Sequence, residues 1–151
     1  MKRLLLTLCL LISFSAHAKT VFLECDGVYK LCAKSEIRAT QCDKPEKQRF
    51  VISFDGKSVL DDEDGLITFK NKCQELGDKI VCSDTFKLHT GGNEVFETGA
   101  RSLTINRATG ALLYEIDTEL TPQQPSYAKG IRGLTGKYEA QCIPREKKRL
   151  F

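Results

Sequence analysis

Apolar and polar residues alternate at every second position in several short segments of the chain. Leu103 and Ile105, for example, alternate with Ser102, Thr104 and Asn106. The same alternation occurs in segments 21–25, 50–54 and 112–117. A period of two places successive side chains on opposite faces of a β-strand. The pattern therefore predicts a chain made mainly of strands, each with one apolar face.

Turn-forming residues separate these segments. They are Asp26-Gly27, Asp55-Gly56, Asp64-Gly65, Gly77-Asp78, Gly91-Gly92-Asn93 and Thr109-Gly110. Short strands at this spacing are typical of an antiparallel sandwich or a small barrel. We therefore expect an all-β fold with at most one short helix, which the pattern places at Ala33–Ala39.

The N-terminus has the three parts of a secretory signal peptide. Lys2 and Arg3 precede an apolar run at Leu4–Phe14, and Ala16-His17-Ala18 follows it. A basic start, a short apolar run and an Ala-x-Ala end predict export and cleavage near Ala18. The apolar run is shorter than the roughly 20 residues that a membrane span requires.

Removal of this leader defines the expected organisation of the chain. We predict a signal peptide at 1–18, a single β-rich domain at 19–143 and a basic C-terminal tail at 144–151. No later apolar segment is long enough for a transmembrane helix. We therefore expect a periplasmic or secreted protein.

The charge of the chain argues against nucleic acid as a partner. The formal net charge is +3, and two of the basic residues, Lys2 and Arg3, leave with the leader. The remaining chain is close to neutral, whereas nucleic-acid-binding domains carry a strongly basic face.

Six cysteines follow the leader: Cys25, Cys32, Cys42, Cys73, Cys82 and Cys142. An even number of cysteines in an exported chain predicts a disulfide framework. Zinc is the competing interpretation, but the chain has no Cys-x-x-Cys pair and only His89 as a histidine after the leader. We expect no metal and no cofactor.

One hairpin can be placed in register from its turn. Gly77-Asp78, with glycine first, is typical of a two-residue type II′ turn. Counting outward from it places Cys73 opposite Cys82. The cysteines fall at a non-hydrogen-bonded pair, where Cα atoms lie about 4.5 Å apart and a disulfide fits. We therefore predict the disulfide Cys73–Cys82.

The other four cysteines leave more than one pairing open. Cys25 ends the first expected strand and Cys142 lies in the last. Sheets often close by pairing their terminal strands, because this removes exposed edges. This argument favours Cys25–Cys142 and leaves Cys32 to pair with Cys42.

A second hairpin is expected around the loop Arg107–Gly110. With these four residues as the loop, Ile105 faces Leu112 and Leu103 faces Tyr114. One face of the hairpin is then apolar, as an antiparallel sheet over a core requires.

Two sequence motifs are candidates for a catalytic or a metal site. His89 has Ser83 and Asp84 nearby in the sequence, but the chain has no Gly-x-Ser-x-Gly turn, so we expect a solvated histidine. The acidic run Asp61–Gly65 does not fit the ligand spacing of an EF-hand, so we expect a solvated turn rather than a calcium site.

A glycine-rich segment near the C-terminus combines aromatic and basic residues. The candidate binding residues are Tyr127, Lys129, Arg132, Lys137 and Tyr138. Such a segment could bind another envelope protein or an anionic envelope glycan. The alternative interpretation is a glycine-rich loop that leads into the last strand.

Several segments resemble a loose group of small, mostly uncharacterised exported β-rich proteins of Gram-negative bacteria. The shared features are an early strand ending in cysteine, a central Ile-Asn-Arg-x-Thr-Gly hairpin, a late Gly-Lys-Tyr-x-x-x-Cys strand and a basic tail that ends in phenylalanine. They are present here at 21–25, 105–110, 136–142 and 145–151. The resemblance implies a fold and a compartment but no chemistry, and it carries over no catalytic residue.

These observations favour a non-enzymatic role. The sequence shows no catalytic constellation and selects no carboxylate pair among its 20 acidic residues. We expect an exported, disulfide-stabilised domain of a binding or inhibitor type. The alternatives are a small envelope hydrolase that uses carboxylates and a structural subunit of the envelope.

Overall fold

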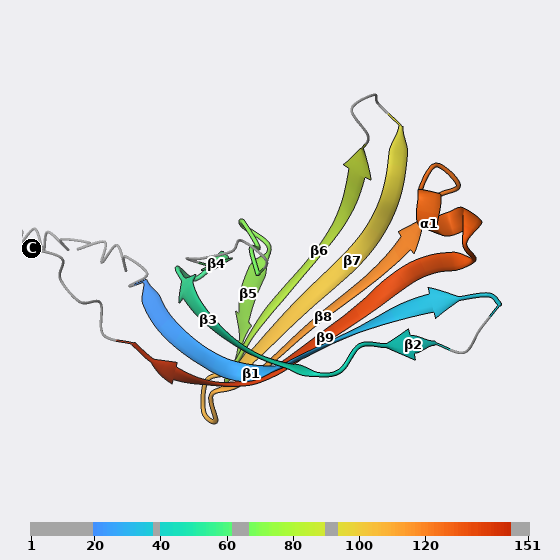
Figure 1. The fold of residues 1–151 in the computed structure, drawn as a ribbon. Helices are drawn as coiled ribbons and strands as arrows, with labels where there is room; N and C mark the ends of the chain where they lie inside the picture. Colours follow the sequence, from blue (N-terminus) through green and yellow to red (C-terminus); the bar gives the residue numbers. More distant parts are fainter. Residues whose placement is uncertain (1–19, 38–39, 62–66, 90–93, 146–151) are drawn as a thin grey trace, which may run out of the picture.

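The chain forms one long antiparallel sheet (Figure 1). The computed structural model describes residues 20–37, 40–61, 67–89 and 94–145. Within these ranges the strand order is β4-β3-β1-β9-β8-β7-β6-β5, and β2 pairs with β1 beside β3. The elements are β1 (Val21–Ser35), β2 (Gln41–Cys42), β3 (Glu46–Phe54), β4 (Val59–Asp61), β5 (Cys73–Leu76), β6 (Lys79–His89), β7 (Val95–Asn106), β8 (Ala111–Leu120), α1 (Pro125–Ala128) and β9 (Ile131–Pro144).

The sheet curls and nearly closes into a barrel. The backbones of Val59 and Phe69 exchange two hydrogen bonds, of 2.7 and 3.1 Å. The Cys73 N–H donates to the Lys57 carbonyl at 2.9 Å. These bonds join the β4 edge of the sheet to the segment that leads into β5 at the other edge. The expected all-β fold is confirmed, and it is a barrel-like sheet rather than a sandwich.

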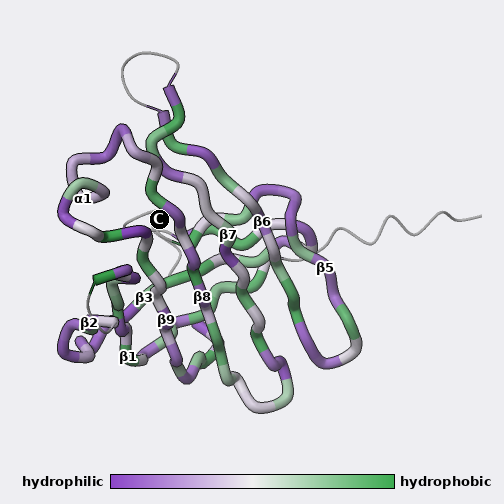
Figure 2. Tube along the Cα trace, turned by 90° about the vertical axis from the view of Figure 1, so that its right-hand side faces the viewer, coloured by the Kyte–Doolittle hydropathy of each residue, from purple (hydrophilic) through white to green (hydrophobic). Residues whose placement is uncertain are grey.

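The core is built from alternate residues of each strand. In β8, Leu112 and Tyr114 are buried while Glu115 and Asp117 are exposed. Figure 2 shows hydrophobic and hydrophilic residues succeeding one another along the strands. The buried core residues are Cys25, Phe50, Ile52, Phe54, Val59, Ile67, Phe69, Ile80, Cys82, Leu103, Ile105, Leu112, Tyr114, Tyr138 and Cys142.

Three disulfides each join two residues that face each other directly across paired strands. Their Cα atoms lie 3.9, 3.9 and 4.0 Å apart. The pairs are Cys25–Cys142 between β1 and β9, Cys32–Cys42 between β1 and β2, and Cys73–Cys82 between β5 and β6. These are the pairs favoured by the sequence, so the framework closes one long loop and two short ones.

Both hairpins have the register counted from their turns. Gly77 has a φ of 57° and Asp78 has no positive φ, which matches a type II′ turn. In the β7–β8 hairpin, Ile105 faces Leu112, and Gly110 ends the loop with a φ of 75°. Glycine is favoured at both positions because it has no Cβ to oppose a positive φ.

The prediction of a helix at Ala33–Ala39 is wrong. Strand β1 continues to Ser35, and its residues Ala33 and Lys34 pair with β9. A helix of two turns is marginal on its own, and here pairing on both sides of β1, with the Cys32–Cys42 disulfide beside it, favours the strand. The one helix among the described residues is the four-residue α1, which begins at Pro125.

The expected leader and most of the expected tail lie outside the described residues. Strand β9 continues to Pro144, and the Arg145 N–H donates to the Phe22 carbonyl at 2.8 Å. The start of the expected tail is therefore attached to the sheet. No helix within the described ranges is long and apolar enough to cross a membrane.

Candidate functional site

An open groove of about 870 Å³ crosses five strands. Its lining residues are Lys30 and Cys32 of β1; Thr135, Gly136 and Lys137 of β9; Glu115, Ile116 and Asp117 of β8; Ala100, Arg101 and Ser102 of β7; Ser83, Asp84 and Thr85 of β6; and Lys72. The exposed Glu115 and Lys137 alternate along their strands with the buried Tyr114 and Tyr138. The groove therefore lies on the sheet face that points away from the core.

Two adjacent rows of side chains form most of the lining. Strand register places the first row in the order Lys30, Lys137, Glu115, Ser102 and Ser83. The second row runs in the order Cys32, Thr135, Asp117, Ala100 and Thr85. Since neighbouring strands lie about 4.8 Å apart, each row spans about 19 Å.

The floor of the groove is low over β6 and β7. Ser83, Thr85, Ala100 and Ser102 line this half, and all four have short side chains. The Ser83 N–H donates to the Lys72 carbonyl at 3.2 Å, so the backbone of Lys72 lies beside β6 at this end of the groove. This half can accept a ligand close to the backbone and offers hydroxyl groups for hydrogen bonds.

The half over β1 and β9 is charged. Lys30 lies directly opposite Lys137, and like charges at such positions destabilise a sheet. Lys137 Nζ lies 2.9 Å from Glu139 Oε1, and this hydrogen bond raises the pKa of Lys137. Lys34 forms an ion pair with Asp117 in the second row. Charges of both signs are thus held along the groove.

On the core side of the same strands lies a second polar cluster. The Arg101 guanidinium lies 5.0 Å from the ring centre of Phe69 and 5.9 Å from that of Phe86. Asp84 Oδ2 lies 3.5 Å from Arg101, and Asp84 Oδ1 lies 3.4 Å from Lys72. Burial raises the pKa of the Asp84 carboxyl, but the hydrogen bond and charge of Lys72 and the hydrogen bonds from the Thr85 N–H and Arg101 outweigh it and hold that pKa below its usual value.

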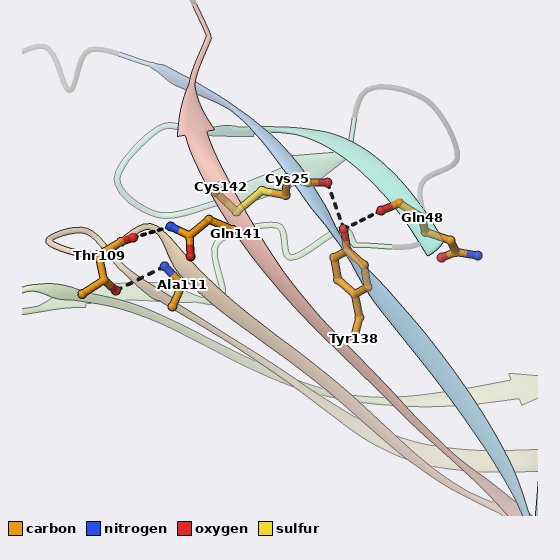
Figure 3. The surroundings of a disulfide bond; sticks show 7 residues. All are labelled: Cys25, Gln48, Thr109, Ala111, Tyr138, Gln141 and Cys142. Atoms are coloured by element: carbon orange, nitrogen blue, oxygen red, sulfur yellow. Dashed lines mark hydrogen bonds between the residues drawn. A yellow bond between two sulfur atoms is a disulfide. The ribbon is translucent and has the colours of Figure 1, made fainter. Parts of the chain in front are cut away.

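Tyr138, a candidate from the sequence, belongs to the core. Its side chain is fully buried, and its hydroxyl lies 2.9 Å from the Cys25 carbonyl and 3.1 Å from that of Gln48, to which it donates. Figure 3 shows the ring beside the Cys25–Cys142 disulfide. The side chain holds β9 to β1 and β3 and does not reach the surface.

Tyr127 and Arg132 meet near α1. The Arg132 guanidinium lies 3.8 Å from the ring centre of Tyr127, and its Nη1 donates to the Tyr127 carbonyl at 2.7 Å. Its Nη2 also donates to Glu36 Oε2 at 2.7 Å, and this hydrogen bond lowers the pKa of Glu36. Arg132 therefore joins α1, the start of β9 and the end of β1.

The sequence candidates do not form one surface. Lys129 is exposed beside Tyr127 and Arg132 near α1, and Lys137 lies in the groove. Tyr138 points to the opposite face of the sheet. Of the five candidates only Lys137 lines the groove.

Sequence reasoning missed most groove residues, among them Lys30, Lys72 and Glu115. Their charges resemble those of any solvated strand face. The signal that could have found them was strand register: counting back from a Cys25–Cys142 pair places Lys30 opposite Lys137.

The described residues form neither a Ser–His–Asp site nor a metal site. Ser83 and Asp84 point to opposite faces of β6, and His89 is exposed at the end of this strand. No group of three or more His, Cys, Asp and Glu side chains within the described ranges is placed to hold a metal ion. The acidic run lies mostly at 62–66, outside these ranges.

Comparison with protein-family models, with curated proteins and with solved structures finds no match to this chain. The fold and the groove therefore define only a class, a disulfide-linked antiparallel β-domain with an open polar groove.

Proposed function

We propose that this chain is an exported binding or inhibitor-type domain that recognises its partner in the groove on its outer sheet face. The groove itself carries the proposal. Its lining comes from five neighbouring strands and spans about 19 Å, so it is large enough for a segment of another molecule. Charged groups at known register positions can select the partner and its orientation.

The rigidity of the site supports a recognition role. The strands below the groove are hydrogen-bonded to one another in a continuous ladder. The Cys32–Cys42 disulfide lies at one end of the groove, and Cys32 itself lines it. A preformed site loses little conformational entropy on binding, which favours affinity.

Export is supported by two independent features. The first 18 residues have the order of a signal peptide, and the three disulfides are typical of proteins outside the cytoplasm. We propose cleavage near Ala18 and residence in the periplasm or outside the cell.

Three described carboxyl groups have pKa values below their usual range, which makes them poor general acids. Hydrogen bonds from Arg132 lower the pKa of Glu36, and backbone N–H groups at Lys57 and Ser58 lower that of Asp55. The pKa of Asp84 is also lowered. A glycosidase needs a general acid with a raised pKa, so these three carboxyl groups suit ion pairs and turns rather than acid catalysis.

The test is a pull-down from a periplasmic extract with the chain from Lys19 as bait. Ala100 is exposed in the groove floor, and Ala100→Tyr fills this floor. Ala111 is an exposed alanine in β8 outside the groove, so Ala111→Tyr is the matched control. We expect a stoichiometric partner that wild type and Ala111→Tyr retain and Ala100→Tyr loses.

Two results would overturn the proposal. One is a partner that Ala100→Tyr retains as well as wild type does. The other is turnover of an envelope glycan that a single Asp or Glu substitution abolishes, since this would identify the hydrolase alternative.

A further inference from the structure

Lys30 is a cation of the groove that has no carboxylate partner among the described residues. Its neighbour in the row, Lys137, contacts Glu139 instead. Two ammonium groups side by side on an exposed face cost stability unless something neutralises them. Glu139 neutralises Lys137, whereas Lys30 has no such partner within the described ranges, and a charge left without compensation is typical of a functional site.

Glu115 is the anion of the same row that forms no salt bridge within the described ranges. It faces Lys137 across β8 and β9, and its charge helps to raise the pKa of Lys137, but Lys137 is bonded to Glu139. The other carboxylate of this part of β8, Asp117, is paired with Lys34. Lys30 and Glu115 are two strands apart in the first row, which corresponds to about 10 Å.

The rest of the lining restricts the chemistry of the ligand. Its described residues include no aromatic side chain on which a sugar ring could stack, and they carry both signs of charge, which disfavours a polyanion. Beyond Glu115 the groove offers Ser102, Ser83 and Thr85. These hydroxyl groups can donate to carbonyl oxygens and accept from N–H groups, as a peptide backbone requires.

We propose that the groove binds an extended peptide segment that carries an acidic group and a basic group about three residues apart. The acidic group contacts Lys30, the basic group contacts Glu115, and the backbone continues over Ser102 and Ser83. A groove of about 19 Å accommodates about six extended residues at about 3.3 Å each. This inference rests on the proposed function, because it names the chemical class of the partner for the same groove.

The first probe is a set of capped hexapeptides of serine and glycine. One carries aspartate at its second and lysine at its fifth position, one carries two aspartates and one carries two lysines. Chemical-shift titration of the labelled chain from Lys19 measures the affinities. We expect the mixed peptide to bind about two- to fivefold more tightly than the other two, as expected for exposed ion pairs, with shifts at Lys30, Ser83 and Ser102.

Charge reversal makes the test specific. Lys30→Glu leaves two anionic positions and should prefer the dilysine peptide. Glu115→Lys leaves cationic positions and should prefer the diaspartate peptide. The double variant should again prefer the mixed peptide, bound in the opposite direction. Both residues are exposed, so folding should be retained.

Matched controls lie outside the groove. Lys44→Glu and Glu46→Lys reverse exposed charges in and before β3, and they should leave the order of peptide affinities unchanged. An order that is the same in wild type and in all variants overturns the inference, and so does the absence of binding by every peptide.

The outcomes separate this inference from the proposed function. If a pectin-type oligogalacturonide binds the groove and the peptides do not, the ligand is an anionic glycan and the inference is wrong. If the pull-down partner is lost in Ala100→Tyr while no peptide binds, recognition in the groove stands and only its assignment to a charged peptide falls.

Discussion

Tyr114 and Tyr138 face each other across β8 and β9, but their hydroxyl groups differ in their hydrogen-bond partners. Both side chains are buried, with exposures of 1% and 0%. The Tyr138 hydroxyl donates to the carbonyls of Cys25 and Gln48. The Tyr114 hydroxyl makes no hydrogen bond of good geometry within the described ranges, and its polar neighbour is the Arg101 guanidinium, which opposes the rise that burial causes in the pKa of Tyr114. The Tyr138 hydroxyl is therefore the better compensated of the two.

Removal of the two hydroxyl groups should have unequal consequences. Tyr138→Phe removes the donor that the Cys25 and Gln48 carbonyls share and should lower the free energy of unfolding by about 1–3 kcal/mol. Tyr114→Phe removes a hydroxyl whose polar neighbour is the Arg101 guanidinium and should lower the free energy of unfolding by less than about 1 kcal/mol. Urea unfolding followed by fluorescence or circular dichroism measures both. Equal losses in the two variants would contradict this difference.

Stability should fall at alkaline pH because of Tyr138. Burial raises its pKa from 10.0 to about 12. Between these values the unfolded chain loses the phenolic proton while the folded chain keeps it, so stability is full below pH 10 and decreases as the pH rises toward about 12. The unfolding free energy of wild type should therefore decrease more steeply over this interval than that of Tyr138→Phe. Parallel curves would contradict the shift.

The disulfides should differ in their contributions to stability. Cys25–Cys142 joins residues 117 apart, and Cys73–Cys82 joins residues 9 apart. Loop-closure entropy gives about 5 kcal/mol for the first and about 3 kcal/mol for the second. We expect Cys142→Ser to abolish soluble accumulation and the double variant Cys73→Ser/Cys82→Ser only to lower the melting temperature.

Yield in the periplasm and thermal unfolding of the purified variants check this order. The β5–β6 hairpin has a type II′ turn and a ladder of paired residues in addition to the covalent bond, so we expect the double variant to keep its register. If the double variant fails to accumulate while Cys142→Ser is stable, the predicted order of the two disulfide contributions is wrong.

Two glycines with positive φ should differ in their tolerance of alanine. Gly77 has open space where a Cβ would lie, whereas at Gly110 this position is occupied by the Cys142 carbonyl oxygen. Gly77→Ala should therefore cost about 1–2 kcal/mol through backbone strain alone. Gly110→Ala should cost more and should also lower the yield. Thermal unfolding of the two variants side by side measures the difference.

The local part of the fold was predictable from sequence. Gly77-Asp78 and the loop Arg107–Gly110 determine their hairpins through turn chemistry and strand alternation, and both registers hold. The pairing of the terminal strands was favoured as well, because sheets often close by pairing their first and last strands and each of these carries a cysteine, Cys25 and Cys142. Each of these arguments uses residues that are close in sequence or covalently joined.

The helix prediction at Ala33–Ala39 failed because local propensity was outweighed by distant pairing. Ala33 faces Leu134 and Lys34 faces Gly133 across β1 and β9, more than 90 residues away. The sequence pattern around these positions does not indicate that they pair with a distant strand.

Most of the candidate site could not be predicted from the sequence, for a similar reason. The glycines and bases around Tyr138 in the sequence predict a surface residue. Its position four residues before Cys142, however, places it on the same face of β9 as that core cysteine. The groove required the registers of β1, β9 and β8 together, since only these bring Lys30, Lys137 and Glu115 into one row.

The most direct test of recognition in the groove is site-specific photo-crosslinking in living cells. A photoreactive amino acid at Ala100 lies in the groove floor, and one at Ala111 lies on the same sheet face outside the groove. The account predicts a discrete covalent adduct from position 100 after irradiation and none from position 111. An adduct from position 111 together with none from position 100 would contradict it.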